Sequence, residues 1–199
     1  ANMIILGTSG SGKSTAAKLI LRSHIRNGYQ IVAVDPEGEI SEMTRMYGGD
    51  VVDLGKGGEY GMVNPLEVIM DADENEIKNG LGYTGLNKTL QSLKAFMKYY
   101  SPDIEEDVLA LFSGVVQDTY ARFGITFTSD FSKFTSKDYP TFSDVYITVT
   151  SKLTSMTEKT HERDVMERLE LKLRPLVREL QYYFNGHTTI NLSLIHISE

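Results

Sequence analysis

The sequence predicts an α/β fold that consists of a partial parallel-sheet core and a mostly helical inserted domain. Over residues 1–65, short apolar runs alternate with a helical pattern, and a glycine-rich loop follows the first run. After Asn64 and Pro65 the helical pattern continues to about residue 180. We therefore expect residues 1–65 to form the first part of the core, 66–180 the helical domain and 181–199 a return to the core.

Three apolar, β-branched runs predict strands of the sheet, at residues 3–6, 31–34 and 51–54. A helix is expected between the first two runs, from about Lys13, because apolar side chains recur there at helical spacing. Asn27 followed by glycine supplies its stop signal. Together, these elements predict a strand, loop, helix and strand in sequence, the unit from which parallel sheets are built.

The inserted domain shows apolar residues at intervals of three and four, which predicts a bundle of helices. Thr141 and Asp144 have the spacing of a capping box, and Pro175 predicts a kink or break in the last helix. The expected helices cover residues 88–100, a segment from about 106, a segment from about 141 and residues 162–180, with a loop at 125–139.

Composition limits the classes of function. The chain has 199 residues and no cysteine, which excludes disulfides and thiolate metal sites. No apolar run approaches the roughly 18 residues that a membrane span needs, so a cytoplasmic protein is expected. The formal net charge is −7, and the excess acid lies after residue 65. Because proteins that grip a nucleic-acid backbone usually carry a basic stripe, the charge does not support nucleic-acid binding.

A phosphate-binding loop lies between the first predicted strand and the first predicted helix. Its pattern is glycine, four residues, then Gly-Lys-Ser. Glycines allow backbone N–H groups to converge on phosphate oxygens, and the helix N-terminus adds positive potential there. The predicted nucleotide-binding residues are Gly7, Thr8, Ser9, Gly10, Ser11, Gly12, Lys13, Ser14 and Thr15.

The end of this loop predicts binding of ATP with Mg²⁺. Lys13 is expected to reach the β- and γ-phosphates and to act in catalysis. The hydroxyl of Ser14 is expected to bind Mg²⁺, and Thr15 can contact the α-phosphate.

An acidic turn with the sequence DPEGE follows the second predicted strand, at residues 35–39. Carboxylates near a triphosphate are tolerated if they hold Mg²⁺ waters, contact a ribose or orient the attacking water. On this interpretation Asp35 binds Mg²⁺ through water, and Glu39 or Glu37 activates water. The alternative is a tight turn whose acids are solvated or cap a short helix at residues 40–46.

Four segments together carry a family resemblance. The stretches GTSGSGKS, DPEGE and NPLEV, and the later pattern LRPL followed by YYFNGHTTINL, resemble the ATPases of conjugative transfer and type IV secretion. These are the TraC, TrbE and VirB-four-like kind, within the HerA and FtsK group of RecA-like motors. The resemblance extends to about residue 192. Glu39 lies 26 residues after Lys13, a spacing similar to that of the catalytic glutamate in some RecA-like ATPases.

The resemblance implies a motor that powers pilus assembly and substrate transfer. Such motors form ring-like homo-oligomers, commonly hexamers, and dock on secretion-channel and inner-membrane components at the cytoplasmic face. Residues 7–15 carry over as the ATP site, with Asp35 and Glu39 as its acidic neighbours. The family also uses a later acidic strand and an arginine from the adjacent subunit, and neither can be placed in this sequence. We therefore expect a fragment that binds nucleotide but does not hydrolyse it efficiently alone.

Both ends of the chain fit a fragment. The sequence opens without methionine a few residues before the first predicted strand, so an upstream part is expected. The closing stretch LSLIHISE alternates like a strand, but it also resembles translated sequencing-adaptor read-through, which predicts a non-native tail from about residue 192.

Three other functions are compatible with the phosphate loop. A DNA translocase of the same motor group is one, although the acidic helical domain argues against it. A small nucleotide kinase is another, but the arginine-rich lid that such enzymes use is not evident. The third is an assembly subunit that responds to nucleotide without much turnover.

Overall fold

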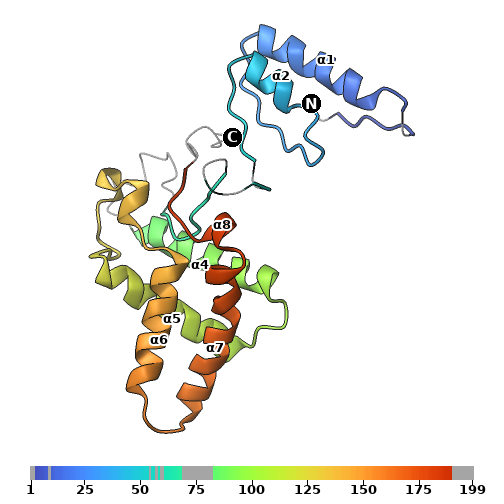
Figure 1. The fold of residues 1–199 in the computed structure, drawn as a ribbon. Helices are drawn as coiled ribbons and strands as arrows, with labels where there is room; N and C mark the ends of the chain where they lie inside the picture. The colour runs from blue at the N-terminus through green and yellow to red at the C-terminus, as the bar shows by residue number, and fades with distance from the viewer. Residues whose placement is uncertain are drawn as a thin grey trace. The chain divides into compact units, whose positions relative to one another are not determined.

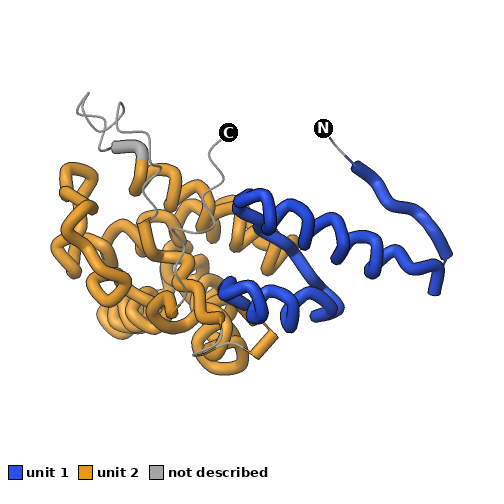
Figure 2. The backbone as a smooth tube through the Cα atoms, turned by 90° about the horizontal axis from the view of Figure 1, so that it is seen from above, with its two compact units in different colours: residues 1–51 blue, residues 52–199 orange. Residues whose placement is uncertain are grey.

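The computed structural model describes residues 3–8, 10–53, 55–56, 58, 61–68 and 83–189. The chain divides into two compact units, Ala1–Val51 and Val52–Glu199 (Figure 2). We call them unit 1 and unit 2 and describe each by itself. The predicted boundaries at residues 65 and 180 stay predictions.

Unit 1 contains two helices, α1 (Lys13–Arg26) and α2 (Ser41–Met46). The predicted start of α1 at Lys13 is confirmed. Its end is confirmed too, because Gly28 has φ of 81°, in the left-handed region that glycine adopts without steric cost. Backbone N–H groups of Asn27 and Gly28 donate to the last carbonyls of the helix and close its C-terminus.

The predicted parallel sheet is not formed, so the α/β prediction is wrong for the residues described. Residues 3–6, 31–34 and 51–53 contain no strand, and Leu54 lies outside the described residues. The side chains of Ile4 and Leu6 are 81% and 87% exposed. Short apolar runs indicate only a tendency to be buried. A strand also requires a neighbour that accepts its backbone hydrogen bonds, and the local pattern does not specify one.

Unit 2 is a helical bundle, as the sequence predicted for its central part (Figure 1). The helices α6 and α7 pack against each other, and α5 packs against both. Within the described ranges, no helix is long and apolar enough to cross a membrane. The elements are α4 (Tyr83–Tyr100), α5 (Glu106–Arg122), the short 3-10 helices η2 (Phe131–Lys133) and η3 (Ser136–Asp138), α6 (Phe142–Ser155), α7 (His161–Arg178) and α8 (Gln181–Phe184).

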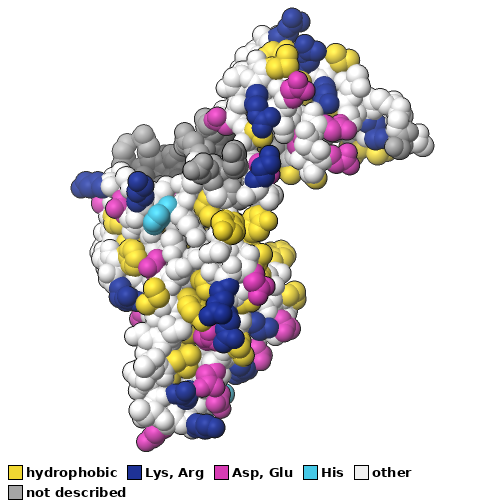
Figure 3. Space-filling view, in the orientation of Figure 1, with side chains coloured by type: hydrophobic (Ala, Val, Ile, Leu, Met, Phe, Trp, Pro, Cys, Tyr) yellow, Lys and Arg dark blue, Asp and Glu magenta, His cyan; other side chains and the backbone are white. Residues whose placement is uncertain are grey.

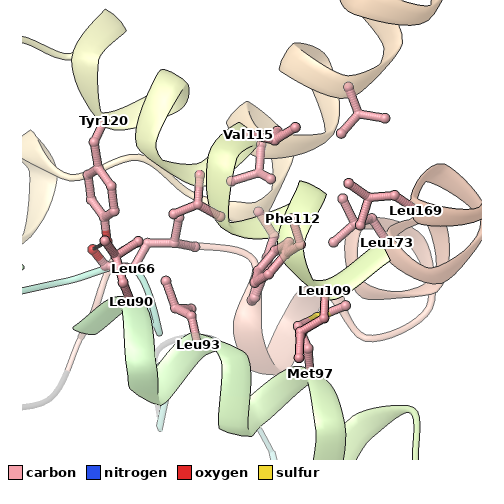
Figure 4. Packing of buried hydrophobic residues seen from close by; sticks show 14 of the residues in the cluster. Leu66, Leu90, Leu93, Met97, Leu109, Phe112, Val115, Tyr120, Leu169 and Leu173 are labelled. Atoms are coloured by element: carbon pink, nitrogen blue, oxygen red, sulfur yellow. Dashed lines mark hydrogen bonds between the residues drawn. The ribbon is translucent and has the colours of Figure 1, made fainter. Parts of the chain in front are cut away.

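One hydrophobic core joins these helices. Phe112 of α5 is fully buried, and Met97 of α4 and Leu173 of α7 belong to the same cluster (Figure 4). Tyr120, also fully buried, donates a hydrogen bond of 2.6 Å to the carbonyl of Leu66, which satisfies its hydroxyl inside the core. Burial raises the pKa of this phenol well above its ordinary value. The core therefore ties the segment before α4 to α5.

Local signals set the ends of the later helices. The predicted capping box at the start of α6 is confirmed, since the carboxylate of Asp144 accepts hydrogen bonds from the backbone and hydroxyl of Thr141, at 2.7 and 2.8 Å. Pro175 was predicted to kink or break the last helix; α7 is not broken there, since it continues to Arg178, and the kink stays a prediction. Proline has no backbone N–H, so one backbone hydrogen bond is lost near the end of α7. The fully buried Leu176 packs the last turn against the core and stabilises it.

A cluster of ion pairs joins the turn between α4 and α5 to α7. The ammonium of Lys172 lies 2.8 Å from the Asp103 carboxylate, and Arg168 bonds Glu105 and Asp107 at 2.7 and 2.6 Å. Hydrogen bonds from Lys172 and Ser101 lower the pKa of Asp103 to about 2.

We predict an acid-dependent loss of stability from this cluster. A carboxyl group with a lowered pKa in the folded state stabilises the fold above its ordinary pKa, and this contribution disappears as the pH falls toward the folded value. Stability should therefore decline between about pH 4 and pH 2. NMR titration should also show that Lys172→Met raises the pKa of Asp103. An unchanged pKa in that variant would contradict the prediction.

Candidate nucleotide-binding site

The loop before α1 contains two glycines whose backbone lies in the left-handed region. Gly10 and Gly12 have φ of 77° and 84°, a region in which side chains with a Cβ are strained. A side chain on Gly7 would collide with the hydroxyl of Ser11. Conformation therefore favours glycine at positions 10 and 12, and the Ser11 side chain would have to move to admit a side chain at position 7. Gly12 leads directly into the first turn of α1 (Figure 1).

The first turn of α1 favours an anion. Gly12 is its N-cap residue, and among the described residues no side chain caps the helix there. The first turn contains no acidic residue. Backbone N–H groups at this end of a helix lack partners within the helix and carry positive partial charge. A phosphate group fits these donors and the local potential.

The side chain of Lys13 lies over the loop. Its ammonium donates a hydrogen bond of 2.8 Å to the carbonyl of Thr8, which also accepts the backbone N–H of Ser11 at 3.2 Å. The ammonium is therefore held next to the backbone that would surround a phosphate. Ser14 and Thr15 follow at the exposed start of the helix, and Ser9 lies outside the described residues.

The acidic turn has a structural role for one of its carboxylates. Asp35 accepts a hydrogen bond of 2.7 Å from the N–H of Ile40, the residue that precedes α2, and the turn includes Gly38 with φ of 72°. This contact matches the alternative interpretation of the turn as a cap for a short helix. Glu37 and Glu39 are exposed. Whether Asp35 or Glu39 takes part in the chemistry stays a prediction.

The partner of the Asn-Gly-His-Thr turn at residues 185–188 was not predicted from the sequence. In the structure, Thr188 of this turn bonds to Asn64 of the Asn-Pro pattern, and the next residue, Thr189, bonds to Met62. The turn at residues 185–188 contains asparagine, glycine and threonine, and residue 64 is an asparagine; these are residue types that bond to backbone groups in turns. This composition indicates a turn, but it does not identify the segment with which the turn pairs. Within the described residues, no group of three acidic or histidine side chains is placed to hold a metal ion.

The sequence pattern is that of a P-loop nucleotide-binding protein. A family model described as the helicase HerA central domain matches residues 2–195, and the chain belongs to this family. A search of curated proteins gave no match.

A solved structure is similar to this chain as well. VirB4 of Thermoanaerobacter pseudethanolicus matches with a TM-score of 0.78 and 25% sequence identity over 93% of this chain. The match covers 45% of the VirB4 chain, so the present chain spans less than half the length of that protein.

Proposed function

We propose that this chain is the ATP-binding part of a VirB4-like ATPase motor of type IV secretion and conjugative transfer. The observation that carries the proposal is the P-loop, in which Gly10 and Gly12 precede α1 and Lys13 is the first residue of this helix, whose N-terminus has no side-chain cap. Membership of the HerA family and the likeness to VirB4 support the motor class. Hydrolysis is proposed for the whole protein, since phosphoryl transfer uses charged groups from several loops together.

The residues present fit MgATP. The loop offers backbone N–H groups and the ammonium of Lys13 to the phosphates, and no acid in the first turn of α1 opposes them. The Ser14 hydroxyl is the proposed protein ligand of Mg²⁺, an ion that retains several waters and takes phosphate oxygens as its other ligands. We further propose that Asp35 contacts those waters and that Glu39 orients the water that attacks the γ-phosphate.

The proposed assembly follows from the family resemblance. Motors of this kind act as ring-like homo-oligomers, here proposed as a hexamer, at the cytoplasmic face of the inner membrane. Their partners would be the secretion channel and inner-membrane components. Comparing the oligomeric state in ADP with that in a non-hydrolysable ATP analogue separates a turnover-driven motor from a subunit that only responds to nucleotide.

Glu39→Gln in the intact motor is expected to retain ATP binding and to slow hydrolysis by about a hundredfold or more, because the amide removes the negative charge that orients and activates water. Steady-state phosphate release measures the effect. Glu37→Gln, two residues away in the same exposed turn, is the matched control and should keep the parental rate. Parental turnover in Glu39→Gln would show that Glu39 is structural, and slowing by Glu37→Gln alone would move the role to Glu37.

A DNA translocase is a second candidate, favoured by the description of the family as a helicase. The charge of this chain favours it less. On the face that Figure 3 shows, basic and acidic side chains of unit 2 are interspersed, and the net charge is −7. Salt-dependent binding of duplex DNA by the full protein would support this candidate.

A further inference from the structure

The acidic turn at residues 35–39 is closed by its own first side chain. Oδ2 of Asp35 accepts a hydrogen bond of 2.7 Å from the N–H of Ile40, and Asp35 is half-buried. Inside this closure the N–H of Gly38 donates to the backbone carbonyl of Asp35 at 3.3 Å, and Gly38 has φ of 72°. The side chain of Asp35 therefore ties the beginning of the turn to the residue that follows it.

The group that Asp35 holds is part of the backbone of Glu39. The N–H of Ile40 and the carbonyl of Glu39 belong to one planar peptide group, so a bond to that N–H fixes the plane that begins at the Cα of Glu39. The Glu39 side chain is exposed. The backbone on either side of its Cα therefore determines where the Glu39 carboxylate can reach.

Helix α2 holds Ile40 from the other side. The carbonyl of Ile40 accepts the N–H and the hydroxyl of Thr44, at 2.9 and 3.1 Å. At the other end of α2, the hydroxyl of Tyr47 accepts a hydrogen bond of 3.1 Å from Nε of Arg22, which lies on α1 (Figure 1). Because α1 begins at Lys13, a continuous series of contacts connects the phosphate loop to the acidic turn.

We propose that Asp35 is a positioning residue for Glu39, which holds the peptide group after Glu39 so that this carboxylate is oriented on the water that attacks the γ-phosphate. The inference rests on the proposed function, in which Glu39 orients this water. The bond engages one of the two carboxylate oxygens of Asp35, so it is compatible with the contact to Mg²⁺-bound water proposed above. Positioning needs an acceptor atom at residue 35, whereas an effect on Mg²⁺-bound water depends on the negative charge.

Amide hydrogen exchange followed by NMR on the full chain tests the contact itself. Asp35→Ala should accelerate exchange of the Ile40 N–H by about tenfold or more, because hydrogen bonds to a carboxylate are among the stronger ones. Asp35→Asn keeps an acceptor oxygen, so its exchange rate should stay within about threefold of the parental value. An unchanged rate for Ile40 in Asp35→Ala would overturn the proposal.

Turnover of the intact motor at saturating Mg²⁺ tests the consequence for catalysis. Asp35→Ala should lower kcat by about tenfold or more and leave the KM for MgATP within about twofold, because the phosphate loop is unchanged. Asp35→Asn should keep most of the parental kcat. Equal slowing by the two variants would show that the charge matters instead of the acceptor, and loss of MgATP binding in Asp35→Ala would place its role at the phosphates; either result contradicts positioning.

A double variant shows whether Asp35 acts through Glu39. In the Glu39→Gln background, Asp35→Ala should change the residual rate by less than about twofold, since the group that it positions is already gone. A full effect of Asp35→Ala in that background would rule out this proposal alone. Parental turnover in Glu39→Gln by itself would instead overturn the proposed role of Glu39, and this inference with it.

Glu42→Ala is the matched control for these experiments. Glu42 is an exposed acidic residue in the first turn of α2, so its replacement changes the net charge as Asp35→Ala does but leaves the bond to Ile40 in place. The parental kcat and the parental exchange rate of Ile40 are expected. An effect as large as that of Asp35→Ala would show that any loss of acid near the turn suffices, which contradicts a specific role of Asp35.

Discussion

Lys13→Ala is expected to abolish tight binding of MgATP, with a loss of affinity on the order of a hundredfold or more. The ammonium lies over the loop at 2.8 Å from the carbonyl of Thr8, where it can exchange this neutral acceptor for a phosphate oxygen. Hydrogen bonds between charged groups contribute about 1.5–3 kcal/mol each, and about 1.4 kcal/mol is a tenfold change in affinity. Isothermal titration calorimetry measures the difference directly.

Lys18→Ala is the matched control for this variant. Lys18 lies on the same helix, so its replacement changes the net charge equally but leaves the loop intact. Its affinity for MgATP should stay within about twofold of the parental value, since a partly exposed charge away from the loop contributes little. If Lys13→Ala bound MgATP as tightly as the parent, the loop would not be a nucleotide site.

Phe112→Ala is expected to destabilise unit 2 by about 3–5 kcal/mol, because it removes a fully buried aromatic ring and leaves a cavity between α4, α5 and α7. Denaturant unfolding followed by circular dichroism measures the loss, since the helices of unit 2 provide most of the described helical signal.

Tyr99→Ala provides the comparison, because the Tyr99 side chain on α4 is 87% exposed and its loss should cost less than about 1 kcal/mol. The two variants remove rings of similar size from opposite environments. Equal destabilisation by both would contradict the assignment of Phe112 to the core.

Helices were predictable from the sequence where their signals are local. The stop at Gly28 and the capping box of Thr141 and Asp144 act within a few residues, and the structure has both. The start of α4 was placed too late, at residue 88 instead of Tyr83. Apolar spacing locates the buried face of a helix more firmly than its first turn, where Thr84 and Gly85 give no periodic signal.

Elements that depend on distant partners were not predictable in the same way. The strands expected at residues 3–6 and 31–34 needed neighbours that the local pattern does not identify, and Val34 is 91% exposed. The predicted final strand and tail at residues 190–199 lie outside the described residues. For the candidate site, the loop glycines and Lys13 were predicted from the spacing of the P-loop pattern and its place before a helix, and their role stays a prediction. The bond between Asp35 and Ile40 depends on how the turn closes.

The contact between Met62 and Thr189 also bears on how such a chain can arise. Met62 and Thr189 lie side by side although 127 residues separate them. If this bundle were inserted into another polypeptide, the two chain ends at the insertion point would need to lie only about as far apart as the ends of a tight turn. Segments whose two ends are adjacent can be gained or lost by gene rearrangement with little disturbance of the flanking chain. The adjacent ends of the bundle would allow it to be gained or lost as one segment.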